Sequence, residues 1–483
     1  MPYAAPPVGA LRWRPPAALT SWSGTRDATQ FAQPCIQLDS DTTTVGSEDC
    51  LYLNVFVPSS ASARSNLPVM VHLHPGGNFF GVPYEDAPAF TDRGVIVVTV
   101  AYRLGVFGFT GLPGLTREQG ASGEYGNLDQ LAALRWVHDN ITAFGGNPAN
   151  VTLFGSSAGS FDTAALMASP LSQGLIARAA VQGDSYWSVT GQYSTVKDAE
   201  FAGTLLAQRV GCSSAADVVA CMRALPADRL VIANGPGDVG PTVGGTVLPK
   251  PVIQLVAERS TVPLLIGFDR EEDSGGFYPF QDETQSAYEH DTLAIFGPDN
   301  AQQGRSLYPP GSYDSLLWSV IAAQTDAVRG CSTRRLANTV HAPVWRYLYT
   351  HRYEDDPFWS QFRASHVLED PFLWGYDPFG LDPAHTMTAA EQAFAAQLTS
   401  YWTNFAKTGN PNGTGLPAWP RYNTSTEPMI TLDDQIGTTT NYHDMQCAFI
   451  DALQPFPPPW APGKGPPRHD PWGFIRGHAR AIP

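Results

Sequence analysis

One serine of this 483-residue chain stands where a nucleophile is expected. The segment GSSAG at 155–159 fits G-x-S-x-G, directly after the apolar run 151–154 and before the helix-like segment 161–167. A serine on a tight strand-to-helix turn exposes its hydroxyl, and the helix N-terminus offers partial positive charge to an oxyanion. The bare pattern often arises by chance in a chain with 45 glycines, so a plain turn serine is the alternative. The position between strand and helix favours Ser157 as the nucleophile.

A second motif, HPGG at 74–77, lies upstream at the end of another apolar run. Gly76 and Gly77 can present bare N–H groups, whereas Pro75 has no N–H to donate. Together with the amide of Ala158, these glycines are predicted to form an oxyanion hole. An ordinary glycine-rich turn is the alternative.

Two histidines with ligand-like spacing, His72 and His74, share one face of a predicted strand. No third ligand follows at a spacing typical of zinc, so the sequence predicts no metal site and no cofactor.

Short β-branched runs that alternate with helical patterns must position these residues. A helix is predicted where Leu131, Leu134, Val137 and Ile141 repeat at spacings of three and four, ending at 145–148. Strand, helix and strand in this order predict an α/β fold with a mostly parallel sheet and helices on both faces. Ligand chemistry should gather at the carboxyl ends of the strands. Six strands are predicted: 69–74, 95–101, 151–154, 177–182, 262–268 and 344–349.

Composition and charge exclude several classes of function. The net charge of −16 would repel phosphate backbones, so a nucleic-acid partner is not expected. No run approaches 18 consecutive apolar residues, and no signal peptide is visible, so neither a membrane span nor a leader is predicted. The 45 glycines and 42 prolines predict long loops, and residues 455–483 read as a proline-rich C-terminal strap.

The cysteines and sequons favour a secreted glycoprotein. Six cysteines are an even number, which suits an oxidising compartment, although fifteen pairings are open. Sequons also arise by chance, so glycosylation is an expectation only. They stand at Asn140, Asn150, Asn412 and Asn423.

Several long motifs, in order along nearly the whole chain, resemble type B carboxylesterases, the group of cholinesterases and para-nitrobenzyl esterases. This resemblance implies a single α/β-hydrolase domain over 1–483 with long loop insertions, which starts where the family's first shared segment begins and therefore lacks the usual amino-terminal hairpin. The matching segments, besides GSSAG, are PYAAPPVG at 2–9, SEDCLYLNV at 47–55, YRLG at 102–105, GNLDQ at 126–130, AFGGNP at 143–148 and WTNFAKTG at 402–409.

The resemblance also implies the remaining catalytic residues. LLIGFDREEDS at 264–274 is similar to the family's acid segment and places the acid at Glu272, with Glu271 as the fallback. SHVLE at 365–369 matches the histidine segment and points to His366. In the implied mechanism His366 takes the proton of Ser157, Glu272 orients the imidazole, and an acyl-enzyme forms and is resolved by water.

Disulfides and buried ion pairs are implied by the same resemblance. It pairs Arg12 with Glu48 and Arg103 with Asp129 in buried ion pairs that fix architecture. The implied disulfides are Cys35 with Cys50, Cys212 with Cys221 and Cys331 with Cys447.

Departures from the family pattern concern the substrate pocket. Ser156 stands where glutamate commonly precedes the nucleophile, and Asn78 replaces an aromatic residue after the oxyanion glycines. The 36–49 loop has no tryptophan, so choline esters are not expected substrates. The expected pocket residues are Phe79, Phe80, Tyr186 and Trp187.

The resulting hypothesis is a secreted serine esterase with a broad range of carboxylic ester substrates. One alternative is a lipase acting on long-chain acyl esters, because acyl length depends on loops that the sequence does not place. The other is a non-catalytic, neuroligin-like recognition module on the same fold. The sequence leaves the oligomeric state open.

Overall fold

The computed structural model describes residues 1–20, 23–183, 195–237, 239–259, 262–277, 283–353, 356–377 and 386–453. The chain divides into two compact units, the first formed by 1–181 and 193–263 and the second by 182–192 and 264–483. The predicted strap at 455–483 lies outside the described residues. None of the described helices is long and apolar enough to cross a membrane.

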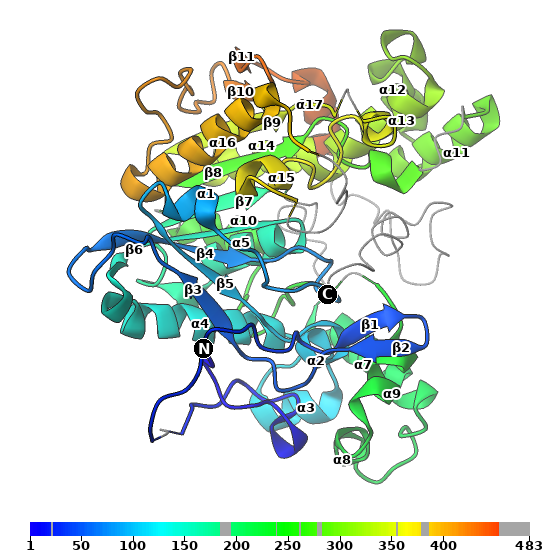
Figure 1. Cartoon of the computed structure of the whole chain (residues 1–483). Helices are drawn as coiled ribbons and strands as arrows, with labels where there is room; N and C mark the ends of the chain where they lie inside the picture. Colours follow the sequence, from blue (N-terminus) through cyan, green and yellow to red (C-terminus); the bar gives the residue numbers. More distant parts are fainter. Residues whose placement is uncertain are drawn as a thin grey trace. The chain divides into compact units, whose positions relative to one another are not determined.

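The first unit is built on strands in the order β7-β6-β4-β5-β3 (Figure 1). β4 pairs in parallel with β5 and β6, whereas β3 pairs antiparallel with β5. Every residue of β5 is buried, as expected of a parallel strand covered on both faces. The strands are β3 (Leu53–Phe56), β4 (Leu67–Leu73), β5 (Ile96–Val100), β6 (Gly146–Ser156) and β7 (Arg178–Gln182), with a separate hairpin of β1 (Gln37–Ser40) and β2 (Thr43–Val45).

Helices of the first unit hold the central strands in place. α4 packs against β6, and α5 packs against both β6 and β4. They bury the stripe that the sequence predicted, including Leu131, Leu134 and Val137. The helices are α1 (Pro88–Thr91), α2 (Gly105–Phe109), α3 (Pro113–Gln119), α4 (Tyr125–Asn140), α5 (Ala158–Ala168), α7 (Val196–Arg209), α8 (Val218–Arg223), α9 (Ala227–Asn234) and α10 (Val252–Arg259).

The second unit has its own strands in the order β8-β9-β10-β11. β8, β9 and β10 run parallel, and β11 pairs antiparallel with β10. The strands are β8 (Leu264–Asp269), β9 (Val344–Tyr349), β10 (Met429–Leu432) and β11 (Gly437–Thr439). The helices are α11 (Gln285–Phe296), α12 (Ala301–Leu307), α13 (Leu316–Thr325), α14 (Cys331–Thr339), α15 (Asp370–Trp374), α16 (Ala389–Thr408) and α17 (Asp444–Ala452).

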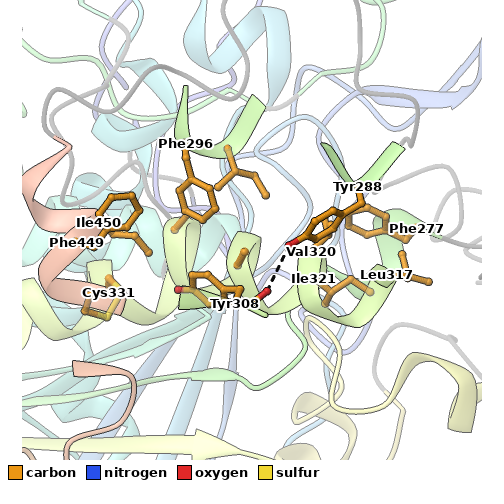
Figure 2. Packing of buried hydrophobic residues seen from close by; sticks show 14 residues of the cluster. Phe277, Tyr288, Phe296, Tyr308, Leu317, Val320, Ile321, Cys331, Phe449 and Ile450 are labelled. Atoms are coloured by element: carbon orange, nitrogen blue, oxygen red, sulfur yellow. Dashed lines mark hydrogen bonds between the residues drawn. A yellow bond between two sulfur atoms is a disulfide. The ribbon is translucent and has the colours of Figure 1, made fainter. Parts of the chain in front are cut away.

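Aromatic and aliphatic side chains form a compact core among the helices of the second unit (Figure 2). Tyr308 lies within it, stacked on Phe296 with ring centroids 5.9 Å apart. The disulfide between Cys331 and Cys447 belongs to the same cluster, so it ties α14 to α17 from inside the core.

All three disulfides implied by the resemblance are present, and the six cysteines leave no free thiol. Both implied ion pairs are also present. Arg12 binds Glu48 through two hydrogen bonds of 2.7 and 2.6 Å, and Arg103 binds Asp129 through two of 2.7 Å. All six predicted strands are confirmed, with boundaries shifted by a few residues and β6 considerably longer than expected.

Candidate active site

Ser157 occupies a strained turn between β6 and α5 in the first unit. Its backbone has φ 53° and ψ −123°, a conformation that non-glycine residues rarely adopt. The residue is 1% exposed, and within this unit its Oγ has no hydrogen-bond partner among the described residues. The turn therefore holds an uncommitted hydroxyl at the N-terminus of an 11-residue helix, where the helix dipole favours negative charge.

Glycine next to Ser157 is required by close packing. A Cβ on Gly159 would lie 1.9 Å from the carbonyl oxygen of Leu73, the last residue of β4. A Cβ on Gly155 would lie 2.6 Å from the same oxygen. The two glycines of the motif thus let the turn sit directly against the strand that leads into residues 74–77.

The 74–77 loop leaves two buried amides without partners. Gly76 has φ 116°, and a Cβ there would lie 2.2 Å from the carbonyl oxygen of Phe80. Its own carbonyl accepts from the amides of Phe79 and Phe80, while the carbonyl of Gly77 accepts from Val239. Among the described residues, the N–H groups of Gly76 and Gly77 donate no hydrogen bond. Buried donors of this kind suit an oxyanion better than a merely structural turn.

A buried carboxylate anchors the loop from behind. Asp162, on α5, accepts hydrogen bonds from Gln130 Nε2 at 2.5 Å, Asn127 Nδ2 at 2.9 Å and Asn78 Nδ2 at 3.3 Å. Burial raises the pKa of Asp162 to about 6, although the three amide hydrogen bonds oppose this shift. Asn78 directly follows Gly77, so the network connects the glycine loop to both α4 and α5.

Glu272 and His366 meet in the second unit. His366 Nδ1 lies 2.5 Å from Glu272 Oε2, and the His366 amide donates to the Glu272 carbonyl at 3.1 Å. The other carboxylate oxygen, Oε1, accepts from the Asp269 amide at 2.9 Å. Arg329 lies 3.9 Å from Oε2 and donates to the carbonyl of Gly183 at 2.8 Å. The carboxylate is therefore fixed from three sides.

The same contacts keep Glu272 ionised. Burial alone would raise its pKa, but the charge and hydrogen bond of His366, the Arg329 guanidinium and the Asp269 amide outweigh burial and hold the pKa below its usual value. A carboxylate at this place holds the imidazole with its proton on Nδ1 and the lone pair on Nε2.

Glu271, the fallback acid, faces elsewhere. Its Oε2 accepts from the Ala364 amide at 3.2 Å, and its Oε1 lies 3.4 Å from Arg352 Nη2. The structure thus brings His366 together with Glu272 and not with Glu271.

A second pair of carboxyl groups lies behind Glu272. Burial raises the pKa of Asp269 well above its usual range, and burial likewise raises the pKa of Glu369 to about 7. No N–H or hydroxyl group among the described residues donates to either Asp269 oxygen, but the Asp269 and Glu369 carboxyl groups lie within hydrogen-bonding reach of each other. A proton held by this pair near neutrality leaves Glu272 as the group that carries the negative charge beside His366.

Half of the expected pocket residues lie in the described chain. Phe79 and Phe80 pack edge to face with ring centroids 4.9 Å apart, Phe79 buried and Phe80 partly exposed. Tyr186 and Trp187 lie outside the described residues.

His72 and His74 are separate core residues. His74 Nδ1 lies 2.8 Å from the carbonyl oxygen of Pro75, and its ring stacks on Tyr102 at 4.5 Å. Burial lowers its pKa to about 4, so the ring is neutral. His72 lies 3.6 Å from Glu85. Within the described chain, neither histidine belongs to a group of three potential metal ligands.

Sequence reasoning missed Asp162 and Arg329. Asp162 is the one charged residue in the mostly apolar stretch 158–168, which is a signal for a buried polar site. Arg329 carried no such signal, because its partners Gly183 and Glu272 lie far away in sequence.

Comparison with known proteins shows the family of this chain. The model of the Carboxylesterase family matches residues 1–450. The para-nitrobenzyl esterase of Bacillus subtilis (strain 168) is 35% identical over 466 residues, covering 90% of this chain and 91% of that protein. The cocaine esterase of Homo sapiens is 32% identical, and the match covers 92% of this chain and 85% of that protein. A solved PNB esterase structure superposes with a TM-score of 0.80 at 31% identity, covering 93% of this chain and 94% of that one.

Proposed function

The chain belongs to the carboxylesterase family with its α/β-hydrolase fold, and from that premise we propose that it hydrolyses carboxylic esters through an acyl-enzyme on Ser157. Glu272 and His366 complete the catalytic triad in this proposal. The observation that carries it is the hydrogen bond between His366 Nδ1 and the buried, ionised Glu272, since this bond leaves Nε2 as a general base.

The proposed reaction begins when His366 Nε2 takes the proton of Ser157 Oγ. The oxygen attacks the ester carbonyl carbon, and the carbonyl electron pair moves onto its oxygen. As the C–O bond to the alcohol breaks, His366 returns the proton to the leaving alkoxide, and acyl-Ser157 remains. Water then attacks the acyl group by the same route, releases the carboxylic acid and restores the hydroxyl.

The amides of Gly76, Gly77 and Ala158 are proposed to bind the oxyanion. Two observations support this role: the glycine amides are buried without partners, and Ala158 is the first residue of α5. Donors held in place before the reaction stabilise developing charge without reorganisation, and loss of one typically costs 10²–10³ in kcat.

The relatives differ widely in the esters that their names record. They include a pyrethroid hydrolase, a fumonisin B1 esterase and an acylcarnitine hydrolase. We propose a small, uncharged ester for this chain, with Phe79, Phe80, Tyr186 and Trp187 along the pocket. The absence of tryptophan in the 36–49 loop and the serine at 156 support the exclusion of choline esters.

Hydrolysis of p-nitrophenyl esters from acetate to palmitate tests this function. Wild type should favour short acyl chains, and Ser157→Ala should lose activity on all of them. Ser306→Ala, which removes an exposed hydroxyl on α12, should match wild type. Activity retained in Ser157→Ala would refute the assignment, whereas a preference for palmitate would favour the lipase alternative. A folded wild type inactive on every ester would favour the recognition module.

We also propose that the protein is a secreted glycoprotein. Three disulfides that use all six cysteines support an oxidising compartment. Asn140 and Asn423 are exposed and suit glycosylation, whereas Asn412 is only partly exposed and its side chain is hydrogen-bonded to the Trp419 backbone. Protein expressed in a secretory host should lose mass on glycosidase treatment, and Asn140→Gln with Asn423→Gln should remove most of that loss. No mass change in wild type would contradict glycosylation.

A further inference from the structure

A histidine and two aspartates converge at the carboxyl ends of two neighbouring strands in the second unit. His351 follows β9, and Asp433 and Asp434 follow β10, whose last residue Leu432 pairs in parallel with Tyr349. More than 80 residues of chain separate the histidine from the aspartates, so only the sheet brings them together. Carboxyl ends of parallel strands are the usual place for ligand sites in such folds.

The donor atoms are spaced as the ligands of one cation. His351 Nδ1 lies 3.1 Å from Asp434 Oδ1 and 3.7 Å from Asp433 Oδ1, and one donor atom from each residue lies within 4.8 Å of the others. Ligands about 2.0–2.2 Å from a zinc-like ion are separated from one another by about 3.0–3.6 Å. The cluster is therefore close to coordination distance before any ion binds.

The burial of His351 is a second observation, independent of the donor spacing, that points to a bound ion. Its side chain is 3% exposed and is packed against the rings of Phe372 at 4.6 Å and Phe394 at 5.1 Å. Both ring nitrogens are buried, and neither makes a hydrogen bond of acceptable geometry among the described residues. A buried imidazole nitrogen without a hydrogen bond is unfavourable. A cation bound jointly by this nitrogen and the two carboxylates would satisfy all three groups.

Other groups orient these donors. Glu391 Oε1 lies 3.7 Å behind His351 Nε2, and its second oxygen accepts from the amide of Thr388 in the capping box of α16. Asp433 uses Oδ2 to accept from Thr350 Oγ1 at 2.8 Å, which leaves Oδ1 for the cluster. A carboxylate behind a ligating histidine is the usual support of zinc sites, because it fixes the tautomer and the ring.

We propose that His351 Nδ1, Asp433 and Asp434 bind one divalent transition cation of the zinc type. The imidazole favours such an ion over Ca²⁺ or Mg²⁺, which prefer oxygen ligands. The aspartate side chains are 41% and 53% exposed, so the ion can enter and keep water ligands. The sequence predicted no metal because only His72 and His74 showed ligand-like spacing.

The role of the ion is structural. Tyr349, at the end of β9, donates its hydroxyl to the carbonyl of Leu368 at 3.1 Å, and Phe372 packs on His351. The metal site thus lies next to the segment that carries His366, but His366 itself is not a metal ligand. Binding should raise the melting temperature of the protein, while ester hydrolysis should persist without the metal.

Calorimetric titration of EDTA-treated, dialysed protein with ZnCl₂ tests the proposal. Wild type should bind one ion saturably, and Asp434→Asn and Asp433→Asn should each weaken binding at least tenfold. Asp139→Asn is the matched control, because His138 and Asp139 form an exposed pair at 3.0 Å outside any three-ligand cluster of the described chain. Its titration should match that of wild type. The aspartate variants alter exposed groups, so they should remain folded.

Melting temperature measured with and without zinc provides the second arm. Zinc should raise it in wild type and in Asp139→Asn but not in Asp434→Asn. Absence of saturable binding, or equal binding in wild type and both aspartate variants, would overturn the proposal. A third outcome would also overturn the proposal: wild type binds no zinc, and Asp434→Asn changes how the stability depends on pH. The cluster would then hold a proton and not a metal ion.

Discussion

Two adjacent glutamates offer a controlled comparison at residue scale. Glu272→Gln should lower kcat by roughly 10³–10⁴-fold, because an amide can hold the wrong imidazole tautomer. Glu271→Gln should cost less than about tenfold, since Glu271 binds the Ala364 amide and Arg352 and not His366. Steady-state kinetics of both variants provide the measurement. Equal losses would mean that the 270–273 segment matters only as a scaffold.

Asp162 should act through the glycine loop that it holds. Asp162→Asn replaces an acceptor of three hydrogen bonds with a group that must itself donate, so one of the donors on Gln130, Asn127 or Asn78 loses its partner. We expect kcat to fall roughly tenfold with a smaller change in KM, because the proposed oxyanion donors shift while the pocket remains. A folded variant with wild-type kcat would contradict this role.

The residues of the candidate site differ in how far they could be predicted from the sequence. Ser157 was predicted as the nucleophile from local chemistry, because its strand and helix neighbours are contiguous. Glu272 and His366 are 94 residues apart and came only through the family resemblance. The ligands proposed around His351 and the donors to Asp162 could not be predicted, because each depends on side chains that only folding makes neighbours.

Among the contacts between elements, the close packing of β4 against α5 is expected to contribute strongly to the stability of the fold. Gly159→Ala places a Cβ 1.9 Å from the Leu73 carbonyl, a rigid backbone atom, so strand and helix must separate. We expect a loss of more than about 3 kcal/mol in the free energy of unfolding. Gly311→Ala is the control, because a Cβ there meets no atom within 4 Å, and it should change stability by less than about 0.5 kcal/mol. Urea unfolding of the two variants compares them, and similar stabilities would contradict this packing argument.

Disulfides connect elements over very different chain lengths. Cys331 and Cys447 are separated by 116 residues and Cys212 and Cys221 by 9. Chain entropy predicts that replacing the first pair by alanine costs about 5 kcal/mol and the second about 3 kcal/mol. Guanidinium unfolding of the double variants measures both losses. The reverse order would mean that native-state packing, not loop closure, sets their contribution.

The elements themselves were largely predictable. Fully buried strands such as β5 and β9 give runs of β-branched and aromatic residues, interrupted by only one polar residue each (Thr99 and Arg346), so their positions were found to within a few residues. The beginning of β6 was missed because residues 146–150 carry Gly, Asn and Pro, which read as a turn.

Buried acids set the pH response of the whole molecule. A carboxyl group with a raised pKa in the folded state binds more protons there than in the unfolded chain, so its stabilising contribution is lost as pH rises through the folded value. Burial gives Asp162 a pKa of about 6 and Glu369 one of about 7. For His443, burial alone would lower the pKa, but the Asp326 carboxylate more than offsets burial and the pKa is raised. Its contribution to stability is therefore also lost as pH rises.

The unfolding free energy should therefore fall between about pH 5 and pH 8. Two lowered pKa values act in the opposite sense. That of Glu272 matters only at more acidic pH, and that of buried His74, about 4, offsets part of the fall below pH 6.5 without reversing it, because several acids titrate the other way. Melting temperatures at pH 5.0, 6.5 and 8.0 provide the measurement, and Glu369→Gln should flatten the slope above pH 6. A melting temperature that rises from pH 5 to 8 would contradict the burial of these acids.

The proposed mechanism requires Ser157 of the first unit to meet His366 of the second. Labelling with a fluorophosphonate, followed by peptide mapping, tests that meeting most directly. We predict one label per chain on Ser157, none in Ser157→Ala, and labelling at least a hundredfold slower in His366→Asn. A label on another residue, or equally fast labelling of Ser157 without His366, would contradict the account.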